Sequence, residues 1–228
     1  MNMNNTKAVW TERPSKSELV ASVWMCKPTE ITPRTVLADP CTSIILVKSN
    51  ERTKIVLRGP ETKPRNEHYM PDTTWIGIRL YPGVKLKNFP AQPYLDCSRP
   101  IKADNDGRFL FEGTLLSFQD FDNAEELIEQ MRDLGYVSGE AIDVQGVTRA
   151  EMSTKAYSRY IKHNTGLSPY KLHQLHRMTK VFELIQDGVP LATIATNQGF
   201  ADQAHLHRAV RQYLGHTPKE LLRWPQKP

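Results

Sequence analysis

Side chains suited to contacting nucleic-acid bases are concentrated near the C-terminus. A segment beginning at Asp202 has apolar residues at helical spacing, and its opposite side carries polar and basic residues. A glutamine amide can pair with the edge of adenine, an arginine guanidinium with guanine, and a methyl group with thymine. The residues with these capacities are Gln203, Ala204, His205, Arg208 and Arg211. They predict a surface that reads double-stranded DNA. The alternative is an amphipathic helix whose polar side is simply hydrated.

The element that must position these residues is a pair of helices joined by a tight turn. Pro190 can open a first helix, which continues with apolar residues at helical spacing. Gly199 suits the turn because it has no side chain to obstruct the approach of two helices. Asp202 is a good N-cap for the second helix, which we expect at about 202–214 and which Gly215 should end. This order of features predicts a helix-turn-helix unit.

A second unit of the same kind is expected upstream. Ser153 is a suitable N-cap for a helix at about 153–164, and Gly166 should end it. The preceding helix of this unit is expected around 140–149. Apolar residues at helical spacing over 170–186 predict one long helix that links the two units. The outward side of the 153–164 helix carries Thr154, Lys155, Ser158, Arg159 and Lys162.

Charge is distributed unevenly along the chain. Residues 148–228 contain 12 lysines and arginines and five acidic residues, a net charge of +7, which leaves −2 for residues 1–147. Basic side chains attract phosphates and release counterions from DNA on contact. The C-terminal third is therefore the part expected to bind a polyanion.

The first half of the chain has a different pattern. Frequent prolines exclude long helices before about residue 120. Asn123 is a plausible N-cap for a helix that Gly135 should stop. We therefore predict an α+β protein with a β-rich domain at 1–120 and an all-α domain at 121–228, with two helix-turn-helix units joined by a linker helix. Short runs typical of strands cover 19–26, 43–48, 54–57 and 74–81.

Three stretches of the helical region resemble the AraC/XylS-family DNA-binding domain. They are TGLSP at 165–169, the segment 194–218, and Arg177 in the linker helix, and the strongest match spans 152–222. The resemblance implies a transcriptional regulator that inserts two recognition helices into successive major grooves of promoter DNA. The first unit departs from the family pattern, with Val147 and Glu151 at places that usually hold alanine and glycine.

The same resemblance assigns roles to individual residues. In the first unit the family's base-reading positions fall on Lys155, Ser158 and Arg159, and in the second they fall on Gln203, Ala204, His205 and Arg208. Thr217 and Lys219 match positions that touch the phosphate backbone. Such backbone contacts position a protein on DNA without reading sequence.

The N-terminal domain resembles the effector domains that accompany such modules. Its WIGIRLYPG stretch, 75–83, is similar to a strand and turn that recur in them. A small-molecule or protein effector, a second copy of the chain and RNA polymerase are the expected partners beside DNA. The alternatives are a purely structural β domain, a protein-interaction platform, and a regulator without an inducer.

Catalysis is not expected. His68 is the one histidine before residue 150, so a histidine metal site in the β domain lacks ligands. No G-x-S-x-G elbow or nucleotide-binding glycine loop occurs in the sequence. Cys26, Cys41 and Cys97 lack the spacing of a zinc or disulfide framework, which also argues against an alkyl-transfer repair protein. We therefore predict no enzyme activity, no metal and no cofactor.

No membrane association is expected either. The longest apolar run, Ile44–Val47, is far below the roughly 18 residues that can span a bilayer. The N-terminal residues lack the apolar stretch of a secretory signal. We expect a bacterial, cytoplasmic protein.

Overall fold

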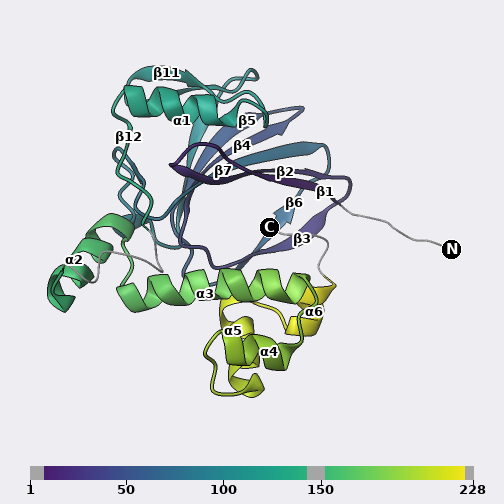
Figure 1. The fold of residues 1–228 in the computed structure, drawn as a ribbon. Helices are drawn as coiled ribbons and strands as arrows, with labels where there is room; N and C mark the ends of the chain where they lie inside the picture. Colours follow the sequence, from purple (N-terminus) through teal and green to yellow (C-terminus); the bar gives the residue numbers. More distant parts are fainter. Residues whose placement is uncertain (1–7, 143–151, 224–228) are drawn as a thin grey trace.

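The computed structural model describes residues 8–142 and 152–223, with strands first and helices after them (Figure 1). The first part also contains the 3-10 helix η1 (Gln92–Tyr94) and α1 (Ala124–Asp133). Its strands are β1 (Ala8–Pro14), β2 (Val20–Pro28), β3 (Thr32–Val36), β4 (Thr42–Ser49), β5 (Thr53–Arg58), β6 (Arg65–Tyr69), β7 (Thr73–Leu80), β8 (Lys85–Leu86), β9 (Ser98–Ala103), β10 (Arg108–Phe111), β11 (Thr114–Ser117) and β12 (Val137–Ser138). The second part consists of α2 (Thr154–Thr165), α3 (Pro169–Gln186), α4 (Leu191–Asn197), α5 (Gln203–Leu214) and α6 (Pro218–Leu222). The predicted α+β fold class is confirmed.

Eight antiparallel strands form the main sheet, in the order β1-β2-β7-β4-β5-β9-β10-β11. The strands β3 and β6 pair separately, as do β8 and β12. Strand β4 lies inside the sheet, between β7 and β5, and most of its residues are buried. Because successive side chains of a strand point to opposite faces, Ile44 and Leu46 join one core cluster while Ile45 and Val47 join another.

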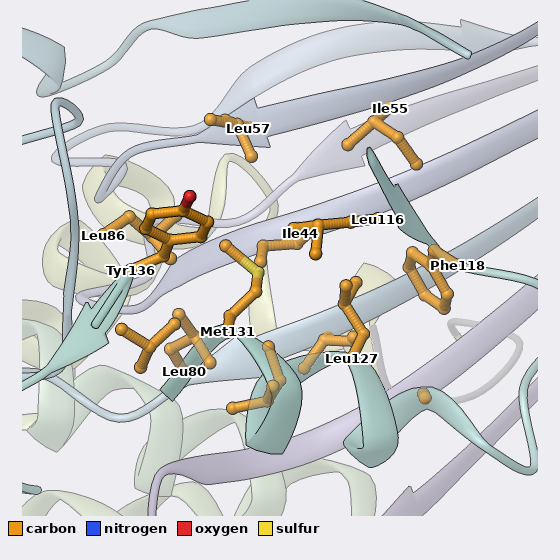
Figure 2. Close-up of a cluster of buried hydrophobic side chains, with 14 of the residues drawn as sticks. Ile44, Ile55, Leu57, Leu80, Leu86, Leu116, Phe118, Leu127, Met131 and Tyr136 are labelled. Atoms are coloured by element: carbon orange, nitrogen blue, oxygen red, sulfur yellow. The ribbon is translucent and has the colours of Figure 1, made fainter. Parts of the chain in front are cut away.

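Helix α1 covers the first of these faces. Its residues Leu127 and Met131 are almost completely buried and point toward Ile44 of the sheet, as Figure 2 shows. The sequence correctly predicts this helix and its end near Gly135. The predicted domain boundary at residue 120 places α1 with the helical domain. The buried side chains of α1 instead pack in the core of the β-rich part. Periodicity shows which side of a helix is apolar, but it does not show which partner buries that side.

The second face of the sheet is lined with aromatic rings. The rings of Trp10 and Trp24 stack with their centroids 4.8 Å apart. A Cβ atom at Gly77 of β7 would lie 2.2 Å from the Trp24 ring, so only glycine fits beneath that indole. This contact is a physical reason for the glycine in the WIGIRL strand.

The helical part has its own core, built around α3. Leu172, Leu175 and Phe182 lie on its buried side, and helices α2, α4, α5 and α6 all contact α3. The linker helix predicted at 170–186 is thus confirmed, with one more residue at its start. The helix expected around 140–149 falls mostly on residues 143–151, which lie outside the described residues together with the departures at Val147 and Glu151, and the described residues 140–142 are not helical.

The two parts of the chain are in direct contact. Leu37 and Ala38, which follow β3, belong to the same core cluster as the helices. The amide of Ala38 donates to the carbonyl of Tyr213 at 3.1 Å. Within β3 itself, the Thr35 hydroxyl lies 2.8 Å from Nε2 of His216. Figure 1 shows α3 between the β-rich part and helices α4 to α6, with α2 at one end of α3.

Candidate nucleic-acid interface

The second helix-turn-helix unit is formed by α4, a turn at Gly199, and α5. Gly199 has a φ of +68°, a left-handed conformation that favours glycine. Phe200 follows and is buried between the helices. The Asp202 side chain then accepts a 2.6 Å hydrogen bond from the amide of His205, which confirms it as the N-cap. Gly215 ends α5 in the left-handed conformation.

Helix α5 separates its apolar and polar residues as predicted. Its core side is formed by Leu206, Ala209, Val210, Tyr213 and Leu214. Four of the five predicted DNA-contacting residues on it are exposed: Gln203, Ala204, Arg208 and Arg211. At its start, α5 therefore exposes the amide of Gln203 and the methyl group of Ala204. One turn later it exposes the guanidinium of Arg208.

His205 is more constrained than its neighbours. Its ring is half-buried and packs edge-on against Phe200, with the centroids 5.2 Å apart. Its Nδ1 lies 3.4 Å from the amide of Ala201 in position to accept. This ring therefore also has a structural role: it supports the turn from within the unit.

The described part of the first unit is α2 and its two caps. The Ser153 hydroxyl accepts from the amide of Ala156, and Gly166 ends the helix with a φ of +71°. Ile161 is fully buried, while Tyr157 and Tyr160 are partly buried against the helical core. All five residues predicted to face DNA are exposed: Thr154, Lys155, Ser158, Arg159 and Lys162.

Arg177 fixes the second unit to the linker helix. Its guanidinium donates to the carbonyl of Gln198 at 3.3 Å and to Oε1 of Gln174 at 2.6 Å. It also stacks over the Phe200 ring, 4.1 Å from the centroid. The sequence marked Arg177 only through the family resemblance, and the structure shows a positioning residue that holds the turn before α5.

Residues after α5 include both predicted phosphate contacts. Lys219 is exposed near the start of α6, whereas the Thr217 hydroxyl is engaged in a capping box with Glu220. The hydrogen bonds from Thr217 lower the pKa of Glu220, so this carboxylate stays charged beside the cap. Burial lowers the pKa of the adjacent His216, which favours its neutral form against Thr35. Lys219 is thus available for a phosphate, and Thr217 is already hydrogen-bonded.

The basic residues of this surface are not neutralised by neighbouring acids. Within residues 152–223, none of the six lysines and arginines predicted to contact DNA has a carboxylate oxygen within the 4.0 Å of an ion pair: Lys155, Arg159, Lys162, Arg208, Arg211 and Lys219. Their charge is therefore open to an external polyanion. A hydrated face would more often carry alternating signs.

The histidines, cysteines and acidic residues in the described part of the chain offer little for a metal site or a thiol nucleophile. Among residues 8–142 and 152–223, no group of three or more histidines, cysteines or acidic residues could hold a metal ion. Cys26 and Cys41 are buried thiols, and burial raises the pKa of both, which opposes thiolate chemistry. No helix in the described part of the chain is long and apolar enough to cross a membrane.

Comparisons with known proteins gave matches to a family model and to solved structures. Residues 147–223 match a family model described as a helix-turn-helix domain. The crystal structure of ToxT from Vibrio cholerae O395 matches with 9% identity and a TM-score of 0.45, over 93% of this chain and 96% of that chain. An apo ToxT variant from Vibrio cholerae strain SCE256 matches with 10% identity and a TM-score of 0.43, over 97% and 98%. No curated protein sequence matches the chain.

The matched residues include α2, the linker helix and the complete second unit described above. The family is one of transcription regulators and is not enzymatic. The C-terminal part of this chain is therefore an AraC-type helix-turn-helix domain, and the protein that carries it is a DNA-binding transcriptional regulator.

Proposed function

We propose that the protein reads promoter DNA with both units at once, by inserting α2 and α5 into successive major grooves. The observation that carries this proposal is the way α3 holds the two units. An 18-residue helix is about 27 Å long, and α2 and α5 contact it in different places. Successive major grooves on one face of DNA lie roughly 34 Å apart, so a linker of this length suits the spacing.

The predicted roles of individual residues follow from their exposure. In the first groove, Lys155, Ser158 and Arg159 would face the bases, flanked by Thr154 and Lys162. In the second groove, Gln203, Ala204 and Arg208 would do so, with Arg211 near the backbone. His205 would use the part of its ring that does not pack on Phe200, and Lys219 would contact a phosphate.

Hydroxyl-radical footprinting on a selected DNA site tests the two-groove proposal. We expect two protected windows on one face, about one helical turn apart. Arg159→Ala should remove protection from one window and Arg208→Ala from the other. A single window that both substitutions weaken equally would contradict insertion of two helices.

We further propose that a signal at the N-terminal domain modulates DNA binding. Both units touch this domain, at separate places. The C-terminal end of α2, at Gly166, lies against the backbone of Gln92 in η1, while the end of α5 is bonded to residues in and after β3. A change in the β-rich part can therefore alter how the two units sit relative to each other. Pairing with a second copy of the chain and contact with RNA polymerase are further proposals, which sedimentation and transcription assays test.

A further inference from the structure

A cavity of about 730 Å³ lies between the aromatic face of the sheet and the linker helix. Strand residues such as Trp10 and Arg34 line one side, Phe182 and Gln186 of α3 line another, and Leu214 of α5 completes it. Cavities that hold small organic molecules have volumes of roughly 300–1,000 Å³. The cavity is therefore large enough for a ligand that would touch the β-rich part and the DNA-binding domain together.

Arg34 is the residue on its wall that is suited to an anion. Its guanidinium stacks 3.8 Å from the centroid of the Trp10 ring and 5.2 Å from that of Tyr69, which fixes its plane. Its Nε is shielded from solvent and has no hydrogen-bond acceptor among the described residues. No carboxylate in the described ranges lies within ion-pair distance of Arg34. A rigid guanidinium without an acidic partner suits a bidentate carboxylate.

Each of the other arginines that line the cavity in the described ranges has a carboxylate partner. Arg79 lies 2.8 Å from Asp39 and 3.6 Å from Glu12. Burial opposes the charge of Arg79, yet these neighbours raise its pKa overall. Arg58 lies 2.7 Å from Glu67. Among the described residues that line the cavity, an anionic ligand would thus meet one arginine without a carboxylate partner, Arg34.

The remaining wall places buried charged groups among apolar side chains. Glu61 is buried and lies 3.0 Å from Arg65, but neither of its carboxylate oxygens accepts a hydrogen bond from the described residues. Burial raises the pKa of Glu61, and Arg65 and Arg58 oppose that shift. An alkyl chain laid over these groups would remove water and return no hydrogen bonds, which is costly. Hydroxyl groups can donate to such carboxylates and accept from the serines beside them.

We propose that this cavity binds a hydroxylated organic acid, with its carboxylate on Arg34 and its hydroxyl groups over the paired charges of the wall. The proposal rests on the proposed modulation of DNA binding by the N-terminal domain and names the chemistry of the signal. The stacked pair Trp10 and Trp24 provides apolar wall for the carbon skeleton.

Strand β3 connects this ligand site to the recognition helix. Arg34 and Val36 line the cavity, and Thr35 between them points to the other side, where it meets His216. Two residues beyond the strand, the amide of Ala38 is bonded to Tyr213 of α5. A ligand bound to Arg34 therefore contacts β3, the strand that is hydrogen-bonded to His216 and is followed by the residue that is hydrogen-bonded to the end of α5.

Isothermal titration calorimetry on the full-length protein tests the proposal with four probes. Gluconate and lactobionate are hydroxylated acids, lactose is the neutral counterpart of lactobionate, and decanoate is an acid with an alkyl chain. We expect at least one hydroxylated acid to bind, with a dissociation constant at least tenfold lower than those of lactose and decanoate. At 100 times that constant, the ligand should raise the Tm by about 5 °C or more.

Matched variants test the role of Arg34. Arg34→Gln should weaken binding of the hydroxylated acid at least tenfold, and Arg34→Lys should restore part of it. Arg52→Gln, which removes the same charge from the exposed β4–β5 turn, should leave binding unchanged. Circular dichroism of each variant without ligand checks that it is folded.

Three results would overturn the proposal: no binding of either hydroxylated acid, tighter binding of decanoate, or equal binding by Arg34→Gln and the wild type. The calorimetry needs no DNA, so its failure is distinct from failure of the DNA-binding proposal. Specific DNA binding with no acid bound would remove this inference alone. An acid bound at Arg34 without specific DNA binding would instead remove the proposed function.

Discussion

Replacing Arg177 with methionine tests whether the linker helix holds the second unit in place. Methionine keeps the length and helix propensity of the side chain but removes the guanidinium. The change deletes the hydrogen bond to the Gln198 carbonyl, the one to the Gln174 side chain and the stacking on Phe200. A hydrogen bond from a charged donor contributes about 1.5–3 kcal/mol, and an exposed cation–π contact about 0.5–1 kcal/mol.

Because Arg177 is half-buried and Gln174 can bond to water instead, we expect the loss to lie at the low end of these values. The free energy of unfolding of the helical domain should fall by about 2–3 kcal/mol. Urea unfolding followed by circular dichroism at 222 nm measures it. DNA affinity should also fall, since the turn that Arg177 holds precedes α5.

Arg159→Met is the matched control for this prediction. Arg159 is exposed on α2 and forms no ion pair within the described residues, so its loss should change stability by no more than about 0.5 kcal/mol. Both variants should bind DNA more weakly, but only Arg177→Met should unfold at lower urea. Equal stability of Arg177→Met and the wild type would refute the positioning role of Arg177.

Three further substitutions test other parts of the molecule. Arg208→Ala should weaken specific binding by about 1–3 kcal/mol and relax the preference at one base position, which binding to single-base variants of the site measures. Lys219→Ala should lower affinity for all sequences alike and reduce the slope of log K against log salt by about 1; a sequence-selective loss would contradict a phosphate contact. Gly77→Ala should cost at least about 2 kcal/mol, because the new Cβ would lie 2.2 Å from the rigid Trp24 ring. Thermal unfolding checks this, and Trp24→Leu in the same chain should recover part of the loss.

Local signals in the sequence were sufficient to predict the helix ends. Ser153 and Asp202 cap their helices through the hydrogen bonds expected of their side chains, and Gly166 and Gly215 end them. These interactions join residues three or four apart, so the sequence carries them directly. Exposure of the predicted DNA-contacting residues follows for the same reason, because a helix of known phase has a known outer side.

Contacts between distant segments could not be predicted in this way. The partial burial of His205 depends on Phe200, and the site of α1 depends on which apolar face it meets. The cavity brings Trp10, Arg34 and Phe182 together from three separate elements. Spacing along the chain contains no information about such neighbours, and without Trp24 above it the glycine at 77 has no visible reason.

Selection of bound sequences from a random DNA library most directly tests the central claim that both units read DNA. The full-length protein is used at two salt concentrations. We predict an enriched motif with two blocks about one helical turn apart, and weaker binding at the higher salt concentration. Salt-sensitive binding with no enriched motif, or with a single block that Arg159→Ala leaves unchanged, would contradict simultaneous reading by α2 and α5.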